Sequence, residues 1–362
     1  MRILQILFGI VVLIVIVLVN TIVVMWVERK ELGHMQGRLG PMRTGWHGLM
    51  QPFADALKLL GKEDIIPAGA DRTIFLIAPL IAFTPAILVY CATPWVEQIA
   101  GFSFDSGIFL VFAVAAVFPV GVLMAGWSSH NKYSLIGGFR SAAQQISYEV
   151  PMILAVMGVV MLAGSMRLGT IVESQAGLYN IIKQPFAAML FFITLLSEIN
   201  RTPFDLPEAE SELVAGFNTE YSSMRFALFF VAEYANVFTM SLLATLLFLG
   251  GWNGPLLPGI VWLLLKTYAV VFLIIWVRAT LPRVRVDQLM AFGWKGLLPA
   301  ALVNVLITAV GVVTNTWVLV ALEFIALSIF VWAVTRLGAT AGDKRRADAT
   351  ARFAKSREGA SA

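Results

Sequence analysis

Apolar residues occur along this chain in long, nearly uninterrupted stretches, and polar residues gather in the segments between them. Nine stretches of about 15–25 residues fit helices that cross a hydrocarbon core about 30 Å thick. They cover residues 3–27, 73–93, 107–127, 149–163, 185–199, 226–249, 259–277, 297–313 and 317–335. The fourth and fifth are short, and the last two are barely separated, so eight or nine spans fit the pattern. We predict an all-α polytopic membrane protein.

A shorter amphipathic pattern lies in the first polar connection. Its apolar residues recur at the spacing of one helical face, at Leu49, Phe53, Ala56, Leu57 and Leu60. Asp55, Lys58 and Lys62 fall on other faces, which is typical of a helix lying in the membrane interface. Two interpretations stay open: a surface anchor, or the lip of an opening through which a lipid-like ligand enters.

The composition agrees with lipid as the main solvent. Hydrophobic residues make up 59% of the chain, charged residues 13%, and the mean hydropathy is +0.83. A soluble protein of this length would need more charge to cover its core. The lone cysteine, Cys91, excludes an intrachain disulfide and an iron–sulfur cluster held by this chain alone. We predict neither haem nor metal in the spans, because all three histidines lie in polar connections: His34, His47 and His130.

Basic residues are distributed unequally between the two sides of the membrane. With nine spans, most of the 26 Lys and Arg residues fall in the tail and in the connections at 28–72, 128–148, 200–225 and 278–296. Because positive charge marks the cytoplasmic side, we predict the N-terminus outside and the tail inside. Residues 1–337 then form one membrane domain, and residues 338–362 form a flexible basic tail. This asymmetry explains the net charge of +4 without invoking nucleic acid.

One cytoplasmic connection is unusually acidic. Between Glu198 and Arg225 only two arginines accompany six carboxylates, at Glu198, Asp205, Glu208, Glu210, Glu212 and Glu220. Asp205 and Glu208 could form a capping box that starts a short helix, in which Glu208 and Glu212 share a face. A cap needs two of these acids, so the others favour a function.

Three acids approach or enter the bilayer from the same side. Glu149 starts the fourth span, Glu198 ends the fifth, and Glu233 lies within the sixth. Burial and like-charge neighbours favour the protonated form of a carboxylate, so these residues are candidates to carry protons.

Other charged residues each keep two interpretations. Lys266 and Glu323 are solitary within spans, and snorkelling of the side chain or pairing between helices explains each about as well as a function does. The last cytoplasmic connection clusters Arg278, Arg283 and Arg285 beside the membrane. These arginines either anchor the chain at its positive side or neutralise the acidic connection.

Four stretches together resemble a known family. They are VERKELGHMQGRLGP, ADALKLLGKEDIIP, SEINRTPFDLPEAESELVAGFNTEYSSMRFALFF and RATLPRVRVDQLM, and they follow in order along almost the whole chain. They resemble the H-subunit family of bacterial NADH:quinone oxidoreductase, which is equivalent to subunit 1 of mitochondrial complex I. Phe217 stands where that family often has a tyrosine.

The resemblance implies a membrane subunit of a proton-pumping respiratory complex in the bacterial inner membrane. Quinone would be its substrate, and the tunnel that holds quinone would be shared with two peripheral subunits. The resemblance places NADH, FMN and the iron–sulfur clusters on partner subunits. It assigns proton coupling to Glu149, Glu198, Asp205, Glu208, Glu210, Glu212 and Glu233. It assigns quinone binding to Glu28, Arg29, Arg38, Tyr221, Tyr234, Arg278 and Arg283.

Two other functions fit parts of the pattern. A cation/proton antiporter would carry a key lysine or acid on broken helices at mid-membrane, and ion-flux assays on the isolated chain would reveal it. A homologous complex driven by ferredoxin, F420 or a hydrogenase would share this subunit, and the copurifying subunits would reveal that.

Overall fold

The computed structural model of the chain describes residues 2–95, 104–207 and 210–336. The predicted flexible tail, residues 338–362, and Glu208 lie outside the described residues. Within the described ranges the regular secondary structure is helical throughout, which confirms the predicted all-α class.

Eight helical segments in these ranges are long and apolar enough to cross a membrane. They are α1 (Arg2–Met35), α3 (Arg72–Ala92), α4 (Gly107–Ala115) with α5 (Phe118–Ser128), α6 (Lys132–Ala163), α11 (Ser223–Phe248), α12 (Gly259–Thr280), α13 (Val286–Phe292) with α14 (Leu298–Val313), and a last helix, Thr316–Arg336. A ninth apolar helix, α9 (Pro185–Glu198), has 14 residues. At 1.5 Å per residue it is about 21 Å long, shorter than a full span.

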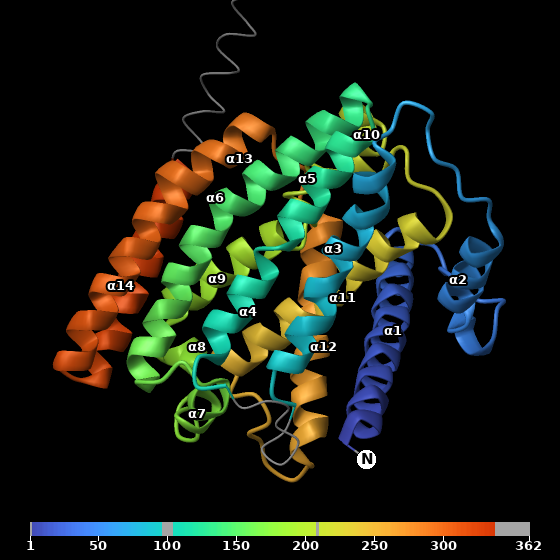
Figure 1. Cartoon of the computed structure of the whole chain (residues 1–362). Coiled ribbons are helices and arrows are strands. Elements are labelled where there is room, and N and C mark those ends of the chain that lie inside the picture. The colour runs from blue at the N-terminus through green and yellow to red at the C-terminus, as the bar shows by residue number, and fades with distance from the viewer. Residues whose placement is uncertain (1, 96–103, 208–209, 337–362) are drawn as a thin grey trace, which may run out of the picture.

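The spans form one bundle with two distinct ends (Figure 1). One end carries α10 (Glu210–Leu213) and the start of α13, and we call it the α10 end. The other carries α7 (Leu168–Glu173) and α8 (Asn180–Lys183), and we call it the α7 end. Helix α11 is the most buried of the long helices, because α1, α3 and α12 pack around it.

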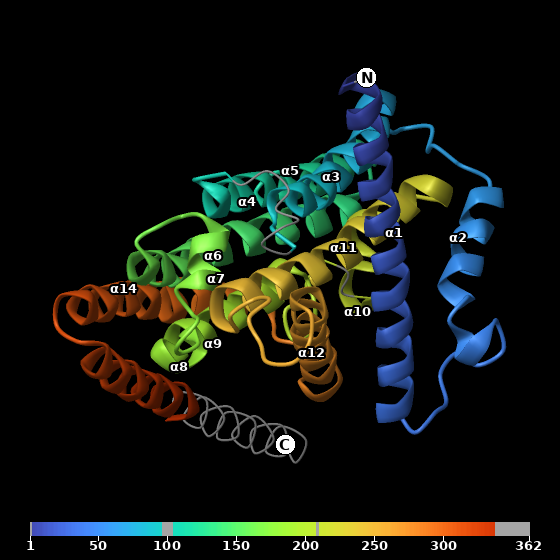
Figure 2. The same cartoon turned by 90° about the horizontal axis from the view of Figure 1, so that it is seen from below.

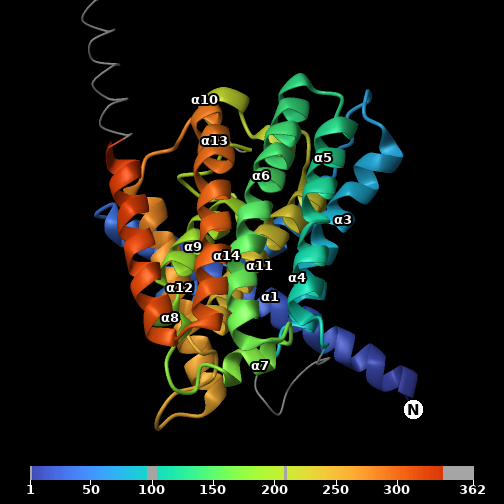
Figure 3. The same ribbon diagram turned by 90° about the vertical axis from the view of Figure 1, so that its left-hand side faces the viewer.

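Helix α1 crosses the bundle at a steep tilt (Figure 3). The predicted amphipathic helix is confirmed as α2 (Gln51–Gly61), which lies beside α1 on its outer side (Figure 2) and also contacts α11. The apolar side chains Phe53, Leu57 and Leu60 are exposed, so no other described segment covers this face of α2.

The predicted connection at residues 128–148 is wrong, because α6 begins at Lys132 and continues through Pro151. Its first half contains glycine, serine and glutamine, which lower the hydropathy of a stretch that is nevertheless largely buried. Small residues let the helices approach closely: a side chain at Gly138 would come within 3.3 Å of the α-carbon of Gly126 in α5. Glu149 therefore lies within a continuous helix instead of at the start of a span.

The predicted connection at residues 278–296 is also too long. Helix α12 continues to Thr280, and α13 begins at Val286. A π-helical turn, Gly293–Leu297, then joins α13 to α14 in one apolar segment, Val286–Val313. At the start of the chain, α1 continues past the predicted span as far as Met35, which places the residues after Val27 on a helix.

Candidate functional site

A cluster of buried charges lies at the α10 end, between α1, α12 and the connection that follows α9. Glu28 of α1 is only 5% exposed and forms salt bridges with Arg278, at the end of α12, and with Arg201 (3.8 Å). Arg201 is 8% exposed, and its guanidinium lies 4.6 Å from the centre of the Tyr234 ring. Buried charges persist only when they are paired, and a guanidinium over an aromatic ring adds a further attraction. One acid thus meets two cations, of which Arg201 is buried and Arg278 is partly exposed.

Arg201 received no predicted role, although the sequence showed it as one of two basic residues in the acidic connection. The structure makes it the centre of this cluster. Glu233, the neighbour of Tyr234 on α11, is likewise buried, at 7% exposure. The cluster therefore contains three of the predicted quinone-binding residues, Glu28, Tyr234 and Arg278, and one predicted proton-coupling residue, Glu233, precedes Tyr234 in the sequence.

A second residue missed by sequence reasoning holds the connection in place. The buried amide nitrogen of Gln144, on α6, donates to the carbonyl oxygens of Ser197 (2.9 Å) and Phe204 (2.8 Å) and to Oδ1 of Asn200 (3.2 Å). A lone glutamine in a stretch expected to be a loop carries no such signal. Its contacts fix the backbone of residues 197–204 against α6.

Farther along this connection, Asp205 pairs with Arg283 at 2.9 Å, and the backbone N–H of Val284 donates to the carbonyl oxygen of Pro203 (3.0 Å). Arg283 therefore neutralises an acid of this segment, which confirms the counter-charge interpretation for that arginine. Arg285 is exposed. The capping box of Asp205 and Glu208 stays a prediction, because Glu208 lies outside the described residues; the carboxylate of Asp205 is engaged by Arg283.

The other acids of this connection are less enclosed. Glu212 is 53% exposed and pairs with Arg140 of α6 at 2.6 Å. Glu220 accepts a hydrogen bond from the amide of Asn131 (2.6 Å). Exposed pairs of this kind contribute about 0–1 kcal/mol. They tie α10 and the following turn to α6 and add little buried charge.

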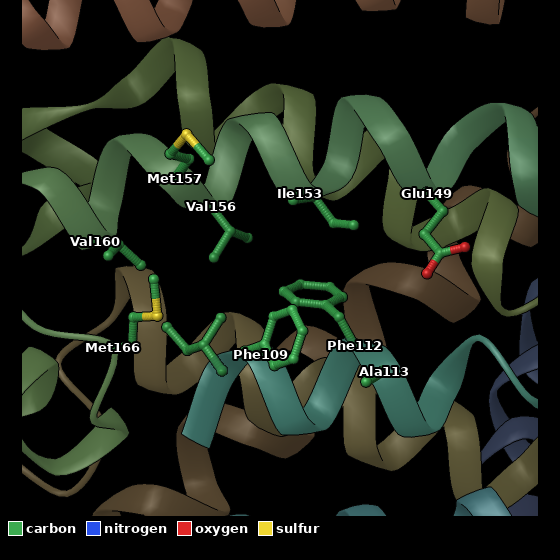
Figure 4. Close-up of a pocket in the computed structure, with 10 residues that line it drawn as sticks. Phe109, Phe112, Ala113, Glu149, Ile153, Val156, Met157, Val160 and Met166 are labelled. Carbon is green, nitrogen blue, oxygen red and sulfur yellow. The ribbon is translucent and has the colours of Figure 1, made fainter. Parts of the chain in front are cut away.

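Glu198 and Glu149 come together on the other side of this connection. Glu198 ends α9 and is buried, whereas Glu149 is partly exposed on α6, near enough that the two charges repel each other. Glu149 also lines an apolar groove of about 360 Å³ between α4 and α6. Figure 4 shows its carboxylate at one end of the groove, beyond Phe112 and Ile153. The groove is open on the flank of the bundle, and Glu149 is the one acidic residue in its otherwise apolar lining.

Segment 198–205 therefore carries three charges that face three different parts of the bundle. Glu198 lies near Glu149, Arg201 meets Glu28 and Tyr234, and Asp205 meets Arg283. This short segment, which Gln144 holds in place, thus links residues predicted to bind quinone with residues predicted to carry protons.

At the outer rim, Arg29 of α1 binds Asp55 of α2 at 2.5 Å. Partial burial tends to raise the pKa of Asp55, but the hydrogen bond and charge of Arg29 outweigh burial and leave that pKa below its usual value. The guanidinium of Arg29 therefore holds α2 against α1. Arg38, also expected at the quinone site, is exposed in the connection between these helices and is not buried with Glu28.

Tyr221 lies in an aromatic core between α3 and α11. Its ring stacks on Phe75 at 4.1 Å and meets Phe229 edge-on, and its hydroxyl donates to the carbonyl oxygen of Phe75 (3.4 Å). Burial raises the pKa of Tyr221 to about 12. These contacts give Tyr221 a packing role at this junction, and a role toward quinone stays a prediction.

The fold and this site define a class: a polytopic helical membrane protein that keeps paired charges buried at one end of its bundle. Residues 8–309 match the family described as NADH dehydrogenase, and the chain belongs to that family. An NADH-quinone oxidoreductase H-subunit of Geobacter sulfurreducens is 51% identical over 82% of this chain and 91% of its own. The corresponding H-subunit of Bacillus cytotoxicus is 53% identical over 78% of this chain and 86% of its own. The resemblance to the H-subunit family is thereby confirmed.

Proposed function

We propose that this chain is the membrane subunit of a proton-pumping NADH:quinone oxidoreductase that receives the quinone headgroup at the Glu28–Arg201–Arg278 cluster. The observation that carries the proposal is segment 198–205, which joins this cluster to Glu198 and Glu149 through one clamped stretch of backbone. NADH as the electron donor follows the names of the relatives, in preference to ferredoxin, F420 or a hydrogenase.

The chemistry of quinone suits the cluster. Reduction of a quinone to a quinol takes up two electrons and two protons, and negative charge develops on the carbonyl oxygens before the protons arrive. Electrons come from the partner subunits, which carry the FMN and iron–sulfur clusters in this proposal. Arg201 and Arg278 can stabilise that charge, because guanidinium groups in a site with little water act strongly on a developing anion. Each new charge also competes with Glu28 for the two cations.

The same competition supplies a route for coupling. When Arg201 turns from Glu28 toward a reduced headgroup, positive charge shifts on the segment that also carries Glu198. Two charges about 10 Å apart interact by about 1.7 kcal/mol at an effective dielectric constant of 20, enough to change a carboxylate's proton affinity about tenfold. Glu198, Glu149 and Glu233 then take up and release protons as quinone is reduced. Asp205, Glu208, Glu210 and Glu212 would set the charge around this path.

The isoprenoid tail of quinone needs an apolar route from the bilayer. Helices α1 and α2 offer one, because both present exposed apolar side chains at the flank, including Phe53, Leu57 and Leu60. The Arg29–Asp55 salt bridge keeps the two helices together at that rim. In this arrangement the α10 end faces the cytoplasm and the peripheral subunits of the complex, the N-terminus lies outside, and the membrane is the bacterial plasma membrane.

A photoreactive quinone tests the site in the assembled complex. The complex would be purified through a tag on this chain, labelled, digested and analysed by mass spectrometry. We expect label on residues 28–61, with loss of the label when natural quinone is added in excess. Label confined to the α7 end, or label that natural quinone does not displace, would contradict the proposed site.

A further inference from the structure

A second buried polar site lies at the α7 end of the bundle, where α9 begins. The carboxylate of Glu323, from the last helix, is fully buried and accepts hydrogen bonds from the backbone N–H groups of Phe186 (3.2 Å) and Ala187. Pro185 has no N–H, and the N–H of Ala188 bonds to the carbonyl oxygen of Gln184 (3.0 Å). Glu323 therefore caps the start of α9 and satisfies donors that a helix leaves free there.

The cap does not account for the other polar atoms around this helix start. Four buried atoms at this helix start have no hydrogen-bond partner among the described residues: Oε1 of Glu323, Oε1 of Gln184, and Oδ1 and Nδ2 of Asn304. All three side chains are 0% exposed. Buried polar atoms without partners are costly, and proteins usually satisfy them with internal water molecules that bond to two to four such groups.

The side chains of Gln184, Asn304 and Thr308 converge on one point of α6, and Glu323 binds the backbone of α9 two residues beyond Gln184. A side-chain carbon added to Gly158 would lie 3.1 Å from Nδ2 of Asn304, 3.1 Å from Oγ1 of Thr308 and 3.2 Å from Nε2 of Gln184. Gln184 also donates to Thr308 at 2.9 Å. Polar groups of α9 and α14 thus meet at a position of α6 that carries no side chain.

The carboxylate of Glu323 has no fixed counter-charge. In the described part of the chain it forms no salt bridge, unlike Glu28 at the α10 end. The nearest basic residue along α8 is Lys183, whose ammonium group donates to the carbonyl oxygen of Ser174 (3.2 Å). Because no cation of the described segments pairs with Glu323, it can bind and release a proton without breaking an ion pair there.

We propose that Glu323, with Gln184, Asn304 and Thr308, is a proton-binding site served by internal water at the α7 end. A hydronium ion donates its proton to the free carboxylate oxygen and becomes water, and the carboxylic acid later returns the proton to another water molecule; no electrons move. This inference rests on the proposed pumping function, in which the site stands on the proton-release side. Glu198 and Glu323 then mark the two ends of α9, about 18 Å apart along the helix axis at 1.5 Å per residue.

Variants of Glu323 separate capping from proton binding. In Glu323→Gln the amide oxygen still accepts from the start of α9, but the side chain no longer binds a proton. We expect the assembled complex to lose at least fivefold in both NADH-driven acidification of vesicles and quinone turnover, since coupled steps stop together. Glu323→Asp keeps a carboxyl group and should retain at least a third of both rates. An infrared difference spectrum should lose one carboxylic-acid band in Glu323→Gln only.

Asn304→Leu provides a second test that does not alter the cap. Replacing an unpaired buried amide by an apolar side chain of similar size is close to neutral for stability. We therefore expect an assembled complex with an unchanged melting temperature and acidification lowered at least threefold. If Glu323→Gln does not assemble, this variant still tests whether the site takes part in proton transfer.

The outcomes are distinct. Wild-type acidification from an assembled Glu323→Gln complex, with all carboxyl bands present, would overturn the inference and leave a capping residue. Wild-type acidification from Asn304→Leu would overturn the role of water. Failure of the wild-type complex to acidify vesicles at all would instead refute the proposed function.

Discussion

The two ends of the bundle hold buried charge in different ways. At the α10 end, charged side chains from distant segments meet one another, as Glu28 meets Arg201 and Arg278. At the α7 end, charged side chains meet the backbone of helix termini, as Glu323 and Lys266 do.

Lys266 shows the second mode most fully. Its ammonium group donates to three carbonyl oxygens that follow the end of α11, those of Leu249 (2.7 Å), Gly251 (3.1 Å) and Asn253 (2.7 Å). It also lies 4.8 Å from the centre of the Tyr179 ring. A cation at a C-terminus and an anion at an N-terminus both complement the partial charges of the helix ends. Both solitary residues thus contact the backbone at the end of another helix, as the interpretation of pairing between helices predicts.

The difference concerns how easily a charge can change partners. A carbonyl or N–H at a helix end is fixed by the backbone, so a charge bound there keeps its protein partner, although a carboxylate such as Glu323 can still take up a proton on its free oxygen. In the cluster of one acid and two arginines, Glu28 can pair with either arginine. A new charge nearby can therefore change which arginine it pairs with. Substitutions at the α10 end should therefore change quinone chemistry, and substitutions of Lys266 should change stability alone.

The largest expected effect comes from Arg201→Met. It removes a buried cation from the cluster; breaking a buried ion pair costs up to about 3–5 kcal/mol, and the cost here is lower because Arg278 still pairs with Glu28. We expect a corresponding loss of stability of the purified complex and at least a tenfold fall in NADH:quinone turnover. The matched control is Arg140→Met, which removes an arginine from the exposed pair with Glu212 and should cost less than about 1 kcal/mol. Equal effects of the two variants on thermal unfolding and turnover would contradict the claim that Arg201 matters more because it is buried.

A smaller effect is expected from Lys266→Met. The loss of charge-assisted hydrogen bonds to partly buried carbonyl groups should lower stability by about 1.5–3 kcal/mol, measured as a lower melting temperature. The apparent KM for quinone should stay unchanged, because the lysine lies at the α7 end. Lys295→Met, at an exposed position near the α10 end, is the control for loss of a positive charge. A raised KM for quinone in Lys266→Met but not in Lys295→Met would contradict the claim that Lys266 affects stability alone.

The smallest effect concerns the rim salt bridge of Arg29 and Asp55. The pKa of Asp55 is lowered in the folded state, so its ionised form stabilises the contact above the ordinary value of 3.8, and this contribution is lost as the pH falls through the lower, folded-state pKa. Asp55→Asn should remove that pH dependence, expose the connection before α2 to protease and raise the KM for a short-chain quinone about twofold. Protease sensitivity equal to wild type at neutral pH would show that other contacts hold α2.

Much of the candidate site could be predicted from residue types, and its pairings could not. Asp205 and Arg283 stood out because six acids and three arginines occupy segments beside apolar stretches. Arg201 and Gln144 did not stand out, because a single arginine or glutamine has no special signal until its neighbours are known. Coulomb energy and hydrogen bonding depend on distances of a few ångströms between segments far apart in the chain.

The boundaries of the spans likewise depended partly on residue types and partly on contacts between helices. Hydropathy identifies residues that lipid or a core can accept, so it located every long apolar helix. It failed at residues 132–148, where Ser134, Ser141 and Gln144 are buried against other helices although the stretch is polar and rich in glycine. Packing between helices favours small and polar residues, and this preference opposes the signal by which a span is detected.

The sequence by itself determined that the chain is a helical membrane protein with one acidic connection, an amphipathic helix and a few charges inside its spans. It did so because transfer from water to lipid depends on the side chains of each stretch taken alone. Only the tertiary structure decided which charges meet. It placed Glu28 between two arginines and Glu323 at the start of α9, two buried glutamates with opposite surroundings. The surroundings of a carboxylate, more than its identity, set whether it pairs, caps or carries a proton.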